Sequence, residues 1–184
     1  MIADEDGKSP LSFLVNVARL PARGMPVRIV ADETQRTALA QEHELLSLER
    51  LEAELVVSAW KSRGVRVAGT LKADYTQECV VTLEPIANRM KEPVSAVFAP
   101  EGSRLLNPDL AEGGEILLDA EGPDSPEPFR GNEIDVGQLV EEFFALGIDP
   151  YPRKAGVAVE TGKVGEDEPR GPLHDKLREL KKRG

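Results

Sequence analysis

The feature that most limits the fold of this chain is a regular alternation of apolar and other side chains between residues 51 and 75. Apolar residues occupy every second position from Leu51 to Ala59. The same period returns from Val65 to Tyr75, where Gly69 takes one of the apolar positions. A period of two is typical of strands, and the short connection at 61–64, which contains a glycine, is typical of a hairpin. The sequence therefore predicts a long antiparallel hairpin with one buried face and one wet face.

Shorter apolar runs predict further strands on both sides of this hairpin. They lie at 13–20, 27–30, 80–83, 94–99 and, more weakly, 115–119. Proline ends several of these runs, and we place Pro85 at a turn because proline cannot donate a hydrogen bond to a strand ladder.

Two helices are predicted from capping signals and helical spacing. Asp32, followed three residues later by Gln35, resembles a capping box before a helix at 33–46. Asp135 begins a second helix at 135–146, for which Gly147 is a plausible C-cap. Three leucines on one face predict a basic helix at the end of the chain, where they stand at Leu173, Leu177 and Leu180.

These elements indicate an α+β fold: an antiparallel sheet of about five to seven strands with two packed helices. The pattern leaves open whether the sheet is barrel-like. We expect a flexible N-terminus at 1–11 and a single domain at 12–153, interrupted by an acidic loop at 100–131 that is rich in glycine and proline. A polar linker and the basic C-terminal helix would follow at 154–184.

Charge separates the classes of partner. The chain carries 23 basic and 33 acidic residues, a net charge of −10, so on average it repels phosphate and suits a basic protein better than nucleic acid. The exception is the C-terminal segment from Arg170, which contains six basic and two acidic residues. This polarity indicates an acidic body with a basic extension.

Few residues suggest catalysis. The single cysteine, Cys79, excludes an intrachain disulfide, and His43 and His174 lack the spacing of metal ligands. We interpret Cys79 as a small buried side chain and His43 as a helix-surface residue. The stretch 156–163 departs from a phosphate-binding loop in its glycine spacing and ends without a serine or threonine. We therefore expect no enzyme activity, no cofactor and no metal. The acidic start and the lack of a long apolar run favour the cytoplasm.

Two segments have a composition unusual for scaffolding. One runs from Gly69 to Pro85 and contains Gln77-Glu-Cys79-Val-Val-Thr82-Leu-Glu84-Pro85. The other runs from Asn132 through Glu141-Glu142 to Asp149-Pro150-Tyr151-Pro152-Arg153. The two prolines hold Tyr151 and Arg153 in an extended geometry. A rigid aromatic beside an arginine suits a binding contact, although Tyr151 could simply cover the helix end.

At these segments the sequence resembles the YceD family, the large ribosomal RNA subunit accumulation proteins of bacteria and plastids. The order of the segments and a Pro-Leu-x-x-x-Leu-x-x-Leu ending from Pro172 add to the resemblance. It implies a role in accumulation of large-subunit ribosomal RNA, hence ribosome assembly, with no established catalytic activity. Many relatives have Cys-x-x-Cys where this chain has Cys79-Val-Val-Thr82, so a metal or thiol-pair role cannot be transferred.

The resemblance and the charge pattern define the candidate binding residues. They are Gln77, Cys79, Glu84, Pro85, Asp135, Glu141, Asp149, Pro150, Tyr151, Arg153, Lys181, Lys182 and Arg183. Our first hypothesis is a non-enzymatic ribosome assembly factor that binds a basic ribosomal protein or a pre-ribosomal particle through its acidic body. The alternatives are a direct RNA-binding protein, which the few aromatic residues disfavour, and a metal-dependent nuclease using loop carboxylates at Asp109, Glu112, Glu115 and Asp119.

Overall fold

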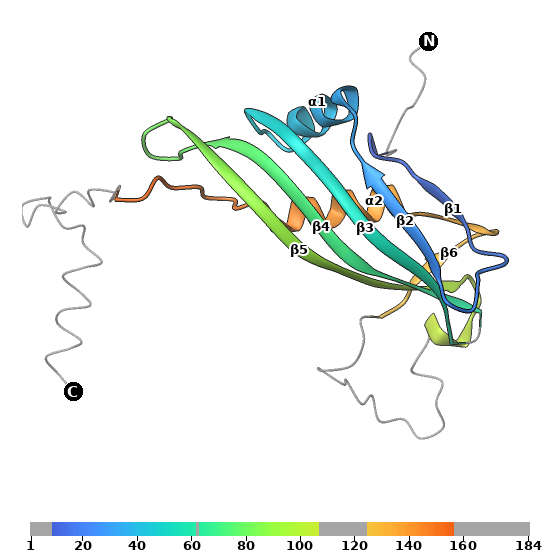
Figure 1. The fold of residues 1–184 in the computed structure, drawn as a ribbon. Helices are drawn as coiled ribbons and strands as arrows, with labels where there is room; N and C mark the ends of the chain where they lie inside the picture. Colours follow the sequence, from blue (N-terminus) through green and yellow to red (C-terminus); the bar gives the residue numbers. More distant parts are fainter. Residues whose placement is uncertain (1–8, 62, 107–124, 157–184) are drawn as a thin grey trace, which may run out of the picture. The chain divides into compact units, whose positions relative to one another are not determined.

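The structure is a computed structural model that describes residues 9–61, 63–106 and 125–156. Its main element is a twisted five-stranded sheet in the order β2-β3-β4-β5-β6 (Figure 1). The strands are β2 (Met25–Val30), β3 (Ser47–Trp60), β4 (Gly64–Glu78), β5 (Pro85–Pro100) and β6 (Glu127–Phe129). The first four are antiparallel to their neighbours, whereas β6 runs parallel to the end of β5.

The predicted hairpin is confirmed as β3 and β4, which pair from Ser47↔Thr76 to Trp60↔Gly64. Alternate residues such as Leu51, Val57 and Val67 are buried on one face, as the period of two requires. The register shifts once, between Leu48 and Arg50.

The prediction that Pro85 lies in a turn is wrong. Pro85 is the first residue of β5 and pairs with Glu78, while the predicted strand at 80–83 is the turn between β4 and β5. The strand predicted at 94–99 also extends through Pro93, which pairs with Thr70. Over this length β5 pairs on one side only among the described strands, because β6 contacts only its last three residues. A proline can be accommodated on such an edge since its missing N–H removes no ladder hydrogen bond there.

Helix α1 (Glu33–Glu42) begins at the predicted capping box but ends earlier than predicted. Asp32 accepts a hydrogen bond from the Gln35 N–H at 2.8 Å, and the Gln35 side chain accepts from the Asp32 N–H at 3.0 Å. The helix stops because Glu44 adopts a left-handed φ of 54° and the Leu45 N–H donates back to the Ala40 carbonyl. This termination normally uses glycine, so the sequence carries no obvious stop signal.

Helix α2 (Val136–Gly147) begins after Asp135, as predicted, and lies behind the sheet in Figure 1. Gly147 is its last residue, and Ile148 rather than Gly147 is the C-cap. A small two-stranded sheet, β1 (Leu14–Asn16) with β7 (Glu133–Asp135), leads into this helix. Gly137 is required at this junction, because a Cβ there would collide with the carbonyl oxygen of Leu11.

One core joins both helices to the same face of the five-stranded sheet, and Leu39 of α1 and Phe144 of α2 are both fully buried in it. Leu11, which we placed in the N-terminal segment, is also part of this core. The fold is α+β, as predicted, but the sheet is open and does not close into a barrel. The predicted strand at 115–119 and the basic C-terminal helix lie outside the described residues.

Residue contacts divide the chain into two units, Met1–Lys154 and Ala155–Gly184. The sheets and helices described above all belong to the first unit. Neither of the described α-helices is long and apolar enough to cross a membrane.

Candidate functional site

The two unusual sequence segments lie against each other at the end of the β4–β5 hairpin. We call residues Cys79–Glu84 the hairpin turn and residues 148–154, which follow α2, the exit segment. The buried side chain of Gln77 donates to the carbonyl of Asp149 at 2.9 Å. The Val80 N–H donates to the Pro152 carbonyl at 3.0 Å, so backbone and side chain together fix the exit segment against the turn.

Local hydrogen bonds give each segment its shape. Two backbone hydrogen bonds close the turn: the Cys79 N–H donates to the Glu84 carbonyl at 2.9 Å, and the Leu83 N–H donates to the Cys79 carbonyl at 2.9 Å. Leu83 adopts a left-handed φ of 59°. In the exit segment, the Asp149 carboxylate accepts from the Tyr151 N–H at 2.9 Å. Such a side chain-to-backbone bond two residues ahead stabilises a turn without help from the rest of the fold.

Cys79 is fully buried, as predicted, and its sulfur is surrounded by donors. The Thr82 side chain contributes most, followed by the Lys154 N–H at 3.5 Å and the N–H groups of Thr82 and Val81. These hydrogen bonds lower the pKa of the thiol to about 6, because they favour the charged form. Besides its contact with the sulfur, the Thr82 hydroxyl donates to Glu84 Oε2 at 3.4 Å within the turn.

An ion pair also joins the turn to the exit segment. Lys154 Nζ lies 2.7 Å from Glu84 Oε2, and both side chains are about half exposed. The lysine lowers the pKa of Glu84, first through the hydrogen bond and then through its charge, and the carboxylate raises the pKa of Lys154 in return.

Around these contacts, large apolar side chains point to solvent. Three belong to the turn and one to the exit segment; their exposed fractions are 47% for Val80, 38% for Val81, 66% for Leu83 and 70% for Tyr151. Tyr151 therefore does not cover the helix end. Pro152, next to it, is the buried residue of the exit segment.

Asp135 lies at the other end of α2 and has a structural environment. Its carboxylate accepts hydrogen bonds from the N–H groups of Phe13, Gly137 and Gln138 and from the Ser12 hydroxyl, at 2.6–3.1 Å. Burial alone would raise the pKa of Asp135, but these four hydrogen bonds outweigh it and the pKa is lowered. The residue thereby connects the N-terminal segment to the start of the helix.

Glu141 is a buried residue of α2 that faces the end of α1. It contacts His43 Nε2 at 3.2 Å and accepts a hydrogen bond from Ser9. The prediction that His43 is a surface residue is wrong: its side chain is 17% exposed and its ring packs edge-on against Phe144 at 5.6 Å. The physical reason is helical spacing: His43 follows the fully buried Leu39 by four residues and so lies on the side of α1 that faces the core.

The structure therefore unites only part of the predicted set. Gln77, Cys79, Glu84 and Asp149 make the contacts between the turn and the exit segment, whereas Asp135 and Glu141 stabilise α2 elsewhere. Pro85, Pro150 and Arg153 are exposed beside those contacts. Lys181, Lys182 and Arg183 lie outside the described residues.

Sequence reasoning missed two contributors to this site. Lys154 pairs with Glu84, 70 positions away, and Asn88 donates to Gln77 Oε1 at 3.1 Å. Neither carries a local signal. For Asn88, a β4–β5 register would have placed it near Gln77, because Gln77 pairs with Ile86 and Asn88 lies two residues further along β5, on the same face of the sheet.

The geometry is that of a binding surface: the hairpin turn and the exit segment are held together by hydrogen bonds and expose apolar side chains. Within the ranges that the structure describes, no group of three or more His, Cys, Asp or Glu side chains is placed to hold a metal ion. The sequence profile of the family described as large ribosomal RNA subunit accumulation protein YceD matches residues 67–182, more than half of the chain.

The chain therefore belongs to the YceD family, as its motifs predicted. The match includes both the hairpin turn and the exit segment. No curated protein and no solved structure matches the chain.

Proposed function

We propose that this protein is a non-enzymatic ribosome assembly factor that supports accumulation of large-subunit ribosomal RNA by binding a basic ribosomal protein or a pre-ribosomal particle. The family description associates such proteins with large-subunit ribosomal RNA. The supporting observation is the union of the two family-like segments in one hydrogen-bonded surface that exposes Leu83 and Tyr151.

This surface suits binding better than catalysis. Its polar groups, those of Gln77, Asp149 and Cys79, already have partners within the protein. A rigid segment with an exposed tyrosine loses little conformational freedom on association, and buried aromatic side chains contribute strongly to interfaces. The overall charge of −10 supports a basic partner, whose approach it would accelerate at low salt.

The test is recovery of large-subunit components on the tagged full chain from a cell lysate, at low and moderate salt. The double variant Leu83→Asp with Tyr151→Ala should lose named ribosomal proteins. A matched control, Leu14→Asp, changes a side chain on β1 that is 57% exposed and should retain them. Recovery of no ribosomal component by the wild-type chain at either salt concentration would refute the proposal.

Activity is tested separately. Purified protein should leave large-subunit ribosomal RNA intact with and without Mg²⁺. Cleavage that depends on the ion and disappears when Asp109, Glu112, Glu115 and Asp119 are replaced by alanine would instead establish the nuclease alternative.

A further inference from the structure

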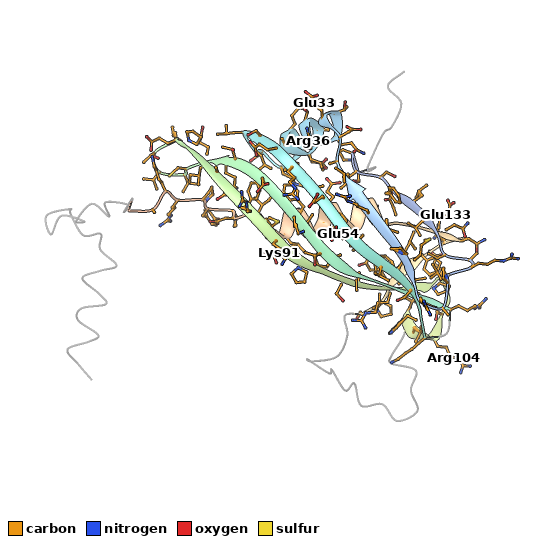
Figure 2. The ribbon with its side chains drawn as sticks, viewed as in Figure 1. Glu33, Arg36, Glu54, Lys91, Arg104 and Glu133 are labelled. Atoms are coloured by element: carbon orange, nitrogen blue, oxygen red, sulfur yellow. The ribbon has the colours of Figure 1, made fainter. Side chains whose placement is uncertain are left out.

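The face of the five-stranded sheet opposite the helices is open to solvent over most of its length; the exception is the end of β5, where Val97 and Ala99 are buried. Tyr75 on the inner face packs against Phe144 of α2 with ring centroids 5.8 Å apart, so its β4 neighbours Lys72 and Asp74 point the other way. Figure 2 shows Glu54 and Lys91 on this second face, in front of the strands, while α2 lies behind them. We call the outward-facing residues of β2–β5 the open face.

Charged residues dominate the open face, and their arrangement is not uniform. Its basic members are Arg28, Arg50, Arg66, Lys72, Arg89 and Lys91, and its acidic members are Glu49, Glu52, Glu54, Asp74 and Glu78. Four basic and two acidic residues meet at the centre. They form two neighbouring cross-strand rows, Glu52–Lys72–Lys91 and Arg50–Asp74–Arg89, which we call the central cluster.

The carboxylates of the central cluster are less exposed to solvent than its arginines. The Glu52 side chain is 13% exposed and that of Asp74 is 30% exposed, against 50% for Arg50 and 86% for Arg89. Arg89 donates through Nε to Asp74 at 2.8 Å, and Arg50 is paired with Glu52. The acids therefore orient guanidinium groups whose remaining N–H donors face solvent.

Lys72 and Lys91 are direct cross-strand partners, so two positive charges stand side by side. Like charges in this position destabilise a sheet. Among the described residues, neither lysine forms an ion pair with a carboxylate, since Glu52 and Asp74 are paired with arginines. An anionic ligand would relieve this repulsion.

The acidic character of the chain does not extend to this surface. The described ranges hold 18 acidic and 15 basic residues, a net charge of −3, whereas the whole chain has −10. More than half of the excess negative charge thus belongs to the rest of the sequence, and the described domain does not repel phosphate as strongly as the composition implies.

We infer that the central cluster binds the phosphate backbone of RNA, an inference that deepens the proposed function and depends on its connection to large-subunit ribosomal RNA. Arginine forks match phosphate oxygens, and lysines add point charges beside them. Strands lie about 4.8 Å apart and successive rows about 7 Å apart, so the cluster offers several phosphate positions on a small area.

The open face cannot read bases by stacking. Trp60, at the far end of the hairpin beside Lys61, is its single aromatic residue in the described strands. Recognition would therefore depend on phosphate contacts and RNA shape rather than on sequence, because stacking platforms need exposed aromatic rings. An acidic protein is the competing ligand, and the experiment includes it.

The test measures binding of a fluorescent duplex RNA of arbitrary sequence to the full chain by anisotropy, between about 50 and 200 mM salt. The double variant Lys72→Glu with Lys91→Glu should weaken binding at least about tenfold at low salt and reduce the slope of log affinity against log salt by about one per lysine. The control variant Arg19→Glu with Arg23→Glu makes the same change in net charge at exposed positions between β1 and β2, and should change affinity by much less.

Equal losses in the two variants, or an unchanged salt slope, would overturn the inference, because net charge alone would then explain binding. Polyglutamate serves as the competing polyanion, and displacement of the RNA by equal carboxylate concentrations would assign the face to acidic proteins instead. The Leu83→Asp with Tyr151→Ala variant separates the two proposals: it should bind this RNA normally even though it fails to recover ribosomal proteins.

Discussion

Lys154 Nζ lies 2.7 Å from Glu84 Oε2, and this contact joins the last residue of the first unit to the hairpin turn. The pair is half exposed, so its contribution to global stability is small. Its effect is local: together with the Val80–Pro152 hydrogen bond, it keeps the exit segment against the turn.

Replacing Lys154 with methionine should therefore release the exit segment without unfolding the domain. The Val80 amide should exchange with deuterium faster, and the pKa of Glu84 should rise towards its ordinary value. Because the folded pKa of Glu84 is lowered, the pair stabilises the protein above about pH 4.3, the ordinary glutamate pKa, and is lost as pH falls through the folded value. Arg153→Met, a neighbouring cation change, is the control and should leave exchange at Val80 unchanged.

The pKa of Cys79 gives a prediction that can be read without ambiguity, since the chain has one cysteine. Thiolate absorbance in the ultraviolet should titrate with a midpoint at about pH 6. Thr82→Val removes the strongest donor and should move the midpoint upward, whereas Thr70→Val, on β4, should not move it. A wild-type midpoint near the ordinary cysteine value of about 8.5 would contradict the prediction.

The same shift has a consequence for stability. The thiol pKa is lower in the folded state than in the unfolded chain, so the charged form favours folding. This contribution is complete above about pH 8.5 and disappears as pH falls through about 6. The difference in unfolding free energy between wild type and Cys79→Ala should therefore grow between those values.

Gln77 connects β4, β5 and the exit segment through one buried amide. Gln77→Leu should destabilise the domain by about 1–3 kcal/mol, because it leaves the Asp149 carbonyl and the Asn88 amide without this partner. Urea denaturation measures the change. Gln138→Leu, which removes an exposed contact to Glu142, should stay within about 0.5 kcal/mol of wild type.

Asp135 accepts four hydrogen bonds, more than an ordinary helix cap. Asp135→Ala should cost about 2 kcal/mol, the upper end for N-caps, and should also release the segment around Ser12 and Phe13. Asp32→Ala, at the cap of α1, should cost about 1 kcal/mol. Since the pKa of Asp135 is lowered in the folded state, its contribution is present above the ordinary aspartate pKa of about 3.9 and is lost at lower pH. Equal costs for the two variants would indicate that the contacts to Ser12 and Phe13 contribute nothing.

Local signals in the sequence predicted the elements that local interactions determine. The period of two specified the hairpin, and the caps at Asp32 and Asp135 specified where both helices begin. The end of α1 could not be predicted, because it depends on Glu44 adopting a conformation that glycine normally takes. The extension of β5 through Pro93 depends on strand order, which is a tertiary property that no short pattern carries.

The candidate site was predictable as a list of residues but not as a surface. The two segments stood out by composition, yet their contact requires α2 to place the exit segment at the end of the hairpin, 72 positions from Gln77. The basic cluster on the open face was not predicted, because the net charge of −10 for the whole chain indicated an acidic surface. A register for β3–β5 was needed before Arg50, Lys72, Arg89 and Lys91 could be placed together.

Lys91 provides the sharpest test of why the central cluster is basic. Lys91→Glu turns a repulsive cross-strand pair with Lys72 into an attractive one, so the free protein should become more stable by about 0.2–1 kcal/mol, measured by urea denaturation. Lys91→Gln, which only removes repulsion, should give a smaller gain. If Lys91→Glu also weakens duplex RNA binding, a single residue both lowers the stability of the free domain and contributes to the complex, which a purely structural lysine would not do. A loss of stability on this substitution would show instead that Lys91 is already compensated within the sheet.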